Sequence, residues 1–228
     1  MISHKVQPSF PSSFFRREAI ARIGTLVCGS YLFGGTVGVI AADTLYPTPA
    51  QIEGPFYPKI MPAEADWNLL KVGLNSFLIG EPLKLYGKVF DLSGFPLAEA
   101  RVELWQCDGQ GIYNHPRAQS QQKFDVGFQG FGVATTDVEG RYKFFTIMPV
   151  SYANRPPHIH IKIKYKGREI LTTQLYIKDH PENNKDGLLS LMLYPGQNKL
   201  MIDPQNEELE NGLTGKSARF DFVLGKRL

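Results

Sequence analysis

The sequence predicts an all-β fold, namely an antiparallel β-sandwich with long loops and an extended N-terminal arm. From residue 82 onward, short runs of alternating apolar and polar residues recur, and turns that contain Gly, Pro or Asp separate them. Regular turn signals between short alternating runs are typical of antiparallel sandwiches. No long run of helical period occurs in the same region, so we expect at least seven short strands and no large helix.

Each predicted strand follows from its own alternation. In the segment 100–108, for example, Val102, Leu104 and Gln106 share one side of a strand. A polar segment rich in Pro and Gly, 178–215, is predicted to carry a short helix between the last two strands. Six of the predicted strands lie within 83–91, 100–108, 135–147, 158–165, 170–177 and 218–224.

The first 42 residues have the order of an export signal. Arg16 and Arg17 form a basic end, a long apolar and Gly-rich run follows, and Ala41-Ala42 provides the small residues of a cleavage site. Adjacent arginines indicate the twin-arginine route, so we expect export to the periplasm and no stable membrane span after cleavage. Two alternatives stay open: the run is retained as a membrane anchor, or Cys28 is a lipoprotein cysteine.

The rest of the chain is predicted to comprise an extended arm, 43–76, and a single sandwich domain, 77–228. The leader carries four basic residues against Glu18, a net charge of +3 that equals the net charge of the whole chain. The remainder is therefore neutral overall, and nothing in its charge favours a nucleic-acid partner. Cys107 is the one cysteine beyond the leader, which excludes an intramolecular disulfide there.

Two histidines begin the predicted strand 158–165, which reads HIHIKIKY. Side chains two positions apart in a strand point to the same face, so His158 and His160 project together while the isoleucines face the core. Lys162 and Lys164 follow on the histidine face, which predicts that this face meets water within a few residues. A lone pair of histidines does not define a metal site, because it is also common on surface strands.

Tyrosines supply the further candidate ligands. No cysteine or carboxylate stands at the spacing of a zinc site around the histidines. Tyr152 precedes His158 by six residues across the stiff segment ANRPP, and Tyr113 lies in a Gly-rich loop after a strand. Phenols titrate near pH ~10 in water, but a trivalent ion stabilises the phenolate. On spacing alone, both tyrosines could equally be half-buried residues of the sandwich.

A resemblance to a known family favours the metal site. The segments EGPFYP, ELWQCDGQGIYNHP, GFQGFG, TTDVEGRYKFFTIMP, SYANRPPHIHIKI and TTQLYI occur in this order within residues 47–178. They resemble the intradiol ring-cleavage dioxygenases, in particular the β-subunit type of protocatechuate 3,4-dioxygenase and its single-chain exported relatives. The resemblance implies a β-sandwich of the transthyretin (prealbumin) type and a non-haem Fe(III) cofactor. The implied iron ligands are Tyr113, Tyr152, His158 and His160.

The resemblance also implies a reaction. A catechol-type diol and O₂ are the expected substrates, the ring is split between its hydroxyl-bearing carbons, and the product is of the cis,cis-muconate type. Tyr152 would accept a substrate proton, Arg155 would stabilise negative charge on the ring, and Gln174 would be a polar neighbour of the substrate. The gap between Tyr152 and Arg155 is shorter than in the longer protocatechuate enzymes, which leaves the identity of the catechol open.

Further positions have two possible roles. Gly54 and Tyr57 are candidates for the mouth of the substrate pocket, although the same segment could pack on a neighbouring subunit, since a homo-oligomer is expected by analogy. His115 is either a hydrogen-bonding partner of the metal ligands or a simple turn residue.

Two other functions stay open at this point. The strand and turn pattern of 87–106 and 134–149 also resembles non-catalytic binding modules of the transthyretin-like or carboxypeptidase-regulatory type. Such a module does not require the tyrosines, the arginine and the histidines together. A dioxygenase fold used for another oxidation or for metal storage is the third interpretation.

Overall fold

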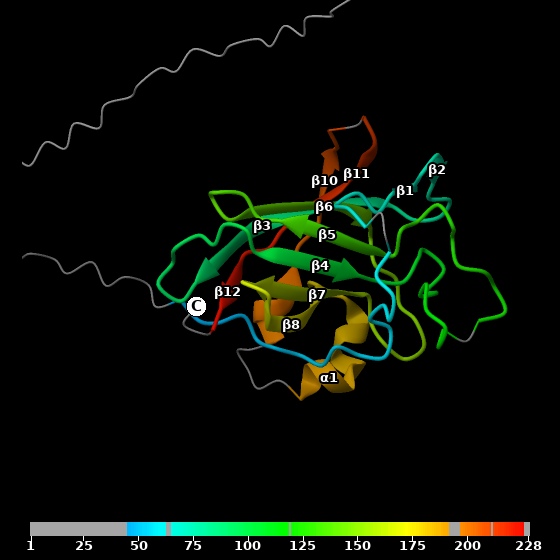
Figure 1. Ribbon diagram of the computed structural model, residues 1–228. Coiled ribbons are helices and arrows are strands. Elements are labelled where there is room, and N and C mark those ends of the chain that lie inside the picture. Colours follow the sequence, from blue (N-terminus) through cyan, green and yellow to red (C-terminus); the bar gives the residue numbers. More distant parts are fainter. Residues whose placement is uncertain (1–44, 63–64, 119, 192–196, 211, 226–228) are drawn as a thin grey trace, which may run out of the picture. The chain divides into compact units, whose positions relative to one another are not determined.

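Alternation of apolar and polar residues builds two five-stranded sheets and one two-stranded hairpin (Figure 1). The computed structural model describes residues 45–62, 65–118, 120–191, 197–210 and 212–225. The predicted export signal, 1–42, lies outside these residues. The all-β sandwich predicted from the sequence is confirmed.

The first sheet is arranged around its longest strand, in which buried and partly exposed residues alternate. Its strands are β10 (Gln205–Glu208), β11 (Thr214–Arg219), β3 (Pro82–Asp91), β12 (Phe222–Leu224) and β6 (Arg141–Ile147). β11 and β12 both pair with β3 in parallel, while β6 pairs with it antiparallel.

The second sheet carries the histidine strand. In order across the sheet, its strands are β5 (Phe131–Thr135), β4 (Arg101–Trp105), β7 (His158–Tyr165), β8 (Arg168–Ile177) and β9 (Met201–Ile202). β7 is therefore central, and its register places His160 opposite Trp105 on β4 and opposite Gln174 on β8. A separate hairpin joins β1 (Lys71–Val72) to β2 (Asn75–Ser76).

The sandwich is not antiparallel throughout, which corrects the sequence prediction. Parallel pairing needs a long connection between the partners, and the excursion after β8 supplies one for β9, which pairs with β8 in parallel. The segment 218–224, predicted as one strand, is divided between β11 and β12. The division lies opposite Gly87 of β3, where a Cβ atom would stand 1.8 Å from the Phe220 carbonyl oxygen.

The hydrophobic core draws on both sheets. The isoleucines of β7 contribute to it, as the alternation of that strand predicts. Fully buried members of the core, each with an exposed fraction of 0%, include Leu83, Leu85, Val89, Val102, Leu104, Phe144, Ile147, Ile159, Ile161, Ile163, Leu175 and Tyr176.

The excursion after β8 contains the short helix that the sequence predicts. It consists of η1 (Pro181–Lys185), α1 (Gly187–Ser190) and η2 (Gln197–Leu200). Asp186 is the N-cap of α1, and its Oδ1 accepts a hydrogen bond from the Leu189 amide at 2.6 Å. In the described part of the chain, no helix has the length and hydrophobicity that a membrane span requires.

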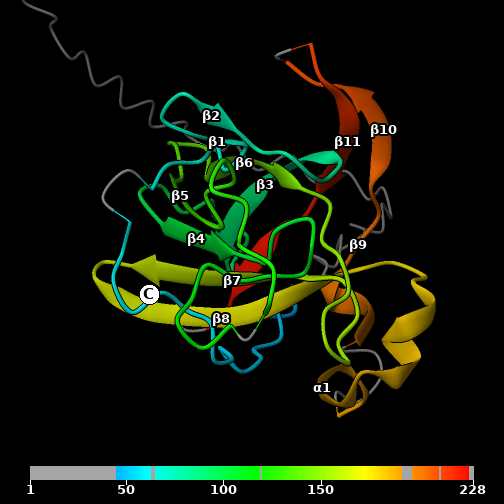
Figure 2. The same cartoon turned by 90° about the vertical axis from the view of Figure 1, so that its right-hand side faces the viewer.

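The N-terminal arm runs along β8 and covers part of the second sheet (Figure 2). The Gln51 amide donates to the Thr172 carbonyl at 2.9 Å, and the Thr173 hydroxyl donates to the Pro49 carbonyl at 2.7 Å. The prediction that the histidine face soon meets water is wrong at Lys162, which is only 4% exposed. The arm covers this lysine, and Glu53 of the arm forms an ion pair with it.

Candidate metal centre

The four predicted ligands lie together at the start of β7. The ring centroids of Tyr113 and Tyr152 are 5.0 Å apart, and those of Tyr152 and His158 are 5.3 Å apart. The His158 and His160 rings are separated by 4.9 Å. Residues from a loop, a turn and a strand thus converge on one small volume.

A backbone carbonyl fixes the orientation of His158. Nδ1 of its ring donates to the Pro156 carbonyl at 2.7 Å, which leaves Nε2 as the nitrogen that carries a lone pair. Nε2 lies 3.5 Å from the Tyr152 hydroxyl. Burial, followed by the nearby charge of Arg155, lowers the pKa of His158 to about 4. The ring is therefore neutral at ordinary pH, the form that binds metals.

His160 is buried without any hydrogen-bond partner for either ring nitrogen among the residues that the structure describes. Its ring stacks on Trp105, with centroids 4.8 Å apart and planes at 11°. Burial and the neighbouring His158 lower the pKa of His160 well below its usual value. Buried polar atoms without partners are rare, and a bound ion, an ordered water or a catalytic role explains them.

A loop held by a buried carboxylate delivers Tyr113. Asp108 accepts hydrogen bonds from the Gln110 and Ile112 amides at 2.9 and 3.0 Å. The Tyr113 ring stacks on Phe56 of the arm at 4.4 Å, and its buried hydroxyl has no hydrogen bond of normal geometry. Burial, and then the neighbouring Tyr152, raise the pKa of Tyr113 well above its usual value.

A tight turn sets the position of Tyr152. The backbones of Tyr152 and Arg155 bond to each other, and Ala153 within the turn has a φ of 48°. Gly111 passes so close that a Cβ atom there would lie 3.2 Å from Tyr152 Cβ. Burial raises the pKa of Tyr152, and the charge of Arg155 partly opposes that rise. The prolines that follow lead directly into β7.

Arg155 and Gln174 contact each other. Nη2 of the Arg155 guanidinium donates to Gln174 Oε1 at 2.7 Å and to the Tyr176 hydroxyl at 3.2 Å. Gln174 also donates to the Ile52 carbonyl of the arm at 3.1 Å. Gln174 is therefore tied to the arginine and to the arm, and the structure places it beside Arg155 at the centre.

The two predicted pocket residues of the arm differ in position. A Cβ atom at Gly54, which has a φ of 78°, would lie 3.4 Å from His160 Cε1, so this glycine lies against the ligand group. The Tyr57 hydroxyl instead donates to Glu103 at 2.7 Å and accepts from Lys164 at 3.2 Å. Tyr57 thus belongs to an ion cluster beside Trp105 and is not brought among the four candidate ligands.

Sequence reasoning missed Phe56, which contacts Tyr113, His115 and Tyr152. Phe56 could have been predicted from its position between Gly54 and Tyr57, both of which are candidate pocket residues. His115 is buried in a turn, where its Nδ1 accepts from the Arg117 amide at 3.0 Å, and Phe56 is the aromatic residue that it contacts. Cys107 is a free, buried thiol whose pKa burial raises to about 12.

The donor set suits a hard trivalent cation. It combines two neutral imidazoles with two phenols, and deprotonated phenols are anionic oxygen ligands. The described residues contain no group of three or more His, Cys, Asp or Glu that could hold a metal ion. The partnerless nitrogens of His160 and the partnerless hydroxyl of Tyr113 therefore fit an ion bound jointly by histidine and tyrosine.

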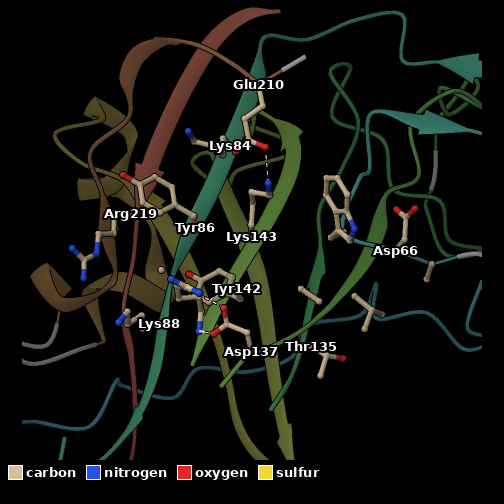
Figure 3. A pocket seen from close by; sticks show the side chains of 16 residues that line it. Asp66, Lys84, Tyr86, Lys88, Thr135, Asp137, Tyr142, Lys143, Glu210 and Arg219 are labelled. Atoms are coloured by element: carbon tan, nitrogen blue, oxygen red, sulfur yellow. Dashed lines mark hydrogen bonds and ion pairs between the residues drawn. The ribbon is translucent and has the colours of Figure 1, made fainter. Parts of the chain in front are cut away.

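A groove of about 1010 Å³ lies elsewhere, lined mainly by residues of β3, β5 and β6 (Figure 3). None of the candidate ligands lines it. Two pairs of its charged side chains bond to each other: Lys143 with Glu210 at 2.7 Å, and Arg141 with Asp137 at 2.7 Å. The groove therefore lacks the donor set found at the start of β7, despite its size.

The chain is similar to known dioxygenases. A family model described as Dioxygenase matches residues 52–226. The chain is 38% identical over 116 residues to the protocatechuate 3,4-dioxygenase beta chain of Burkholderia cepacia, which covers 47% of this chain and 49% of that protein. It is 31% identical over 157 residues to catechol 1,2-dioxygenase of Acinetobacter baylyi, covering 61% and 49%. Both matches span about half of the relative's length.

A solved structure agrees with the sequence matches. The dioxygenase domain of a dioxygenase and carbohydrate-binding protein fusion from Streptomyces sp. SirexAA-E is 30% identical to the chain, with a TM-score of 0.59. The similarity covers 80% of this chain and 100% of that domain.

Proposed function

Because the chain belongs to the intradiol ring-cleavage dioxygenase family, we propose that it is a non-haem ferric enzyme acting on a catechol-type diol. It cleaves the ring between the hydroxyl-bearing carbons, inserts both atoms of O₂ and gives a cis,cis-muconate-type product. The convergence of two buried histidines with a buried tyrosine, Tyr113, and a half-buried one, Tyr152, carries the proposal, together with the unpartnered His160 nitrogens.

The ligands proposed for Fe(III) are Tyr113, Tyr152, His158 and His160. When bound, the ion supplies a Lewis acid that activates the diol toward O₂. The Pro156 carbonyl keeps His158 in the tautomer whose Nε2 is available. Trp105 fixes the plane of the His160 ring, and Phe56 fixes that of Tyr113. Ligands held in this way need little rearrangement when the ion binds.

Proton transfer is assigned to Tyr152. Its hydroxyl lies 3.5 Å from the His158 ring, and Phe56 of the arm packs against the Tyr152 ring. As a phenolate ligand of the ion, this oxygen would be the base that takes a proton from a substrate hydroxyl. Tyr113 is more deeply buried and keeps its position.

Charge stabilisation is assigned to Arg155. Burial lowers the pKa of both histidines, and the positive charge of Arg155 lowers it further, because the guanidinium lies close to the proposed ligands. A fixed cation there stabilises the negative charge that develops on the substrate ring. Gln174 orients the guanidinium through the 2.7 Å hydrogen bond.

The visible spectrum and the iron content of the purified protein test the proposal. We expect a burgundy band from charge transfer between tyrosinate and Fe(III), which Tyr113→Phe combined with Tyr152→Phe abolishes. Catechols added to the iron-loaded protein should shift this band. Each molecule of catechol that is cleaved should then consume one molecule of O₂. A protein that stays colourless after reconstitution with iron would contradict the proposed site.

Export to the periplasm through residues 1–42 is part of the same proposal. The order of basic, apolar and small residues supports it. A reporter that is active only after folded export, fused behind residues 1–42, should reach the periplasm. The matched variant with Arg16→Lys and Arg17→Lys should keep it in the cytoplasm, since the twin-arginine route reads the arginines and not their charge alone.

A further inference from the structure

The guanidinium of Arg155 has one carboxylate partner within the described part of the chain, and that partner comes from the excursion after β8. Arg155 Nε donates to Asp186 Oδ2 in an ion pair. The Asp186 side chain is 0% exposed, whereas that of Arg155 is 21% exposed. The anion is thus buried in the protein, whereas the cation keeps some exposure to solvent and lies close enough to Tyr152 and His158 for its charge to act on both.

The contacts of Arg155 divide into two directions. Asp186 accepts a hydrogen bond from Nε, while Gln174 and Tyr176 accept hydrogen bonds from Nη2. A planar guanidinium held at two of its nitrogens has a fixed orientation. Only Asp186 among these partners carries a negative charge, so it both orients the cation and compensates its burial.

We propose that Asp186 is a positioning residue for the reaction: its buried carboxylate holds the guanidinium of Arg155 toward the substrate position. This inference rests on the proposed function, because it concerns the same site. It also gives a role to the excursion, since α1 begins at Asp186. The segment that carries α1 then determines the geometry of the reaction site without itself contacting the substrate.

The two oxygens of Asp186 have separate partners, which allows a clean substitution. Oδ1 caps α1 by accepting from the Leu189 amide, and Oδ2 receives Arg155. Asp186→Asn keeps an amide oxygen for the cap, because Asn is as good an N-cap as Asp. It removes the negative charge that faces the guanidinium. Asp203→Asn is the matched control, because Asp203 forms an exposed ion pair with Lys178 at 2.8 Å.

Two measurements on the full-length protein test the inference. In the metal-free protein, the Nε–H signal of Arg155 in an arginine-selective proton–nitrogen spectrum should move in Asp186→Asn and stay in place in Asp203→Asn. In the iron-loaded protein, Asp186→Asn should lower kcat/KM by about 100-fold, the size expected for a misplaced catalytic group. Iron content and the tyrosinate band should not change, since no ligand is altered.

A double substitution separates positioning from a general loss of stability. With Arg155→Gln already present, adding Asp186→Asn should lower kcat/KM no further. If Asp186→Asn does not fold, Asp186→Glu replaces it, because it keeps the charge but moves the carboxylate by one methylene. We expect the same shift of the Arg155 signal and a loss of kcat/KM.

The inference is overturned if the Arg155 signal and kcat/KM are both unchanged in the folded Asp186 variant. It is also overturned if the losses from Arg155→Gln and Asp186→Asn multiply. Failure of the proposed function has a different signature: the unaltered protein would then show no tyrosinate band and no O₂ uptake. In that case an unmoved Arg155 signal would overturn the positioning role. A moved signal would confirm the ion pair between Asp186 and Arg155, but its role in the reaction would be overturned.

Discussion

Replacing Tyr113 with phenylalanine removes one buried hydroxyl and preserves the ring stack on Phe56. The hydroxyl has no hydrogen bond of normal geometry among the described residues. An unsatisfied buried polar group costs about 1–3 kcal/mol. We therefore expect Tyr113→Phe to raise the free energy of unfolding of the metal-free protein by about 1–2 kcal/mol. For a chain of this size the melting temperature should rise by about 2–4 °C per kcal/mol.

Tyr142 provides the matched control. It is buried to the same extent, with an exposed fraction of 4% against 5% for Tyr113, but its hydroxyl donates to the Phe220 carbonyl at 2.7 Å. Tyr142→Phe breaks this bond, so it should destabilise the metal-free protein by about 1–2 kcal/mol. Urea unfolding after removal of metal with a chelator measures both variants. The reasoning fails if Tyr113→Phe destabilises the protein as much as Tyr142→Phe does.

In the iron-loaded protein, Tyr113→Phe should lose the advantage in stability that it has in the metal-free protein. If the hydroxyl is a ligand, the iron-loaded protein gains stability from binding and the variant loses most of that gain. The stabilisation by iron should therefore be clearly smaller in Tyr113→Phe than in Tyr142→Phe. Equal stabilisation by iron in the two variants would remove Tyr113 from the ligand set.

Three further predictions concern neighbouring groups. Gly54→Ala places a Cβ atom against His160 at a φ of 78°. It should therefore lower the free energy of unfolding by about 1–2 kcal/mol and weaken iron binding, which titration of the metal-free variant with iron measures. The folded-state pKa of His158 is about 4 and its usual value is 6.5, so the unfolded state binds a proton first. His158 should therefore lower the stability of the metal-free protein by about 3 kcal/mol from pH 6.5 to pH 4, and His160, whose pKa is also lowered, should add to this loss. Urea unfolding across pH measures the fall, and no such loss is expected above pH 6.5. With a thiol pKa of about 12, Cys107 should resist alkylation until the protein unfolds, as mass spectrometry of its peptide would reveal.

The sequence was sufficient to predict the candidate ligands, but not the residues that hold the site in place. Side chains two apart on a strand share a face whatever surrounds them, so His158 and His160 could be paired in advance. Asp186 could not be connected with Arg155, because 31 residues and all of β7 and β8 separate them. In a polar loop, the sequence does not distinguish a buried carboxylate from a solvent-exposed one unless its partner is known.

In the fold, local pattern predicted the long strands and failed where another segment intervenes. The exposed face expected at Lys162 is covered by the arm, whose Glu53 lies 109 residues earlier. β5 was not predicted, because Gly132 interrupts a strand of only five residues. A Cβ atom at Gly132 would stand 2.4 Å from Leu69 Cδ1, so close packing, and not turn chemistry, accounts for this glycine.

The supports of the site share a physical character. Asp108 holds the Tyr113 loop, Asp186 holds Arg155, and the Lys162–Glu53 ion pair holds the arm beside Gly54. Loops cannot be fixed by apolar packing alone, because their backbone amides need partners. A buried charge satisfies several donors at once and does so in one geometry. Precision at the site therefore depends on charged residues outside the ligand set, and variants such as Asp108→Ala should weaken iron binding although they remove no ligand.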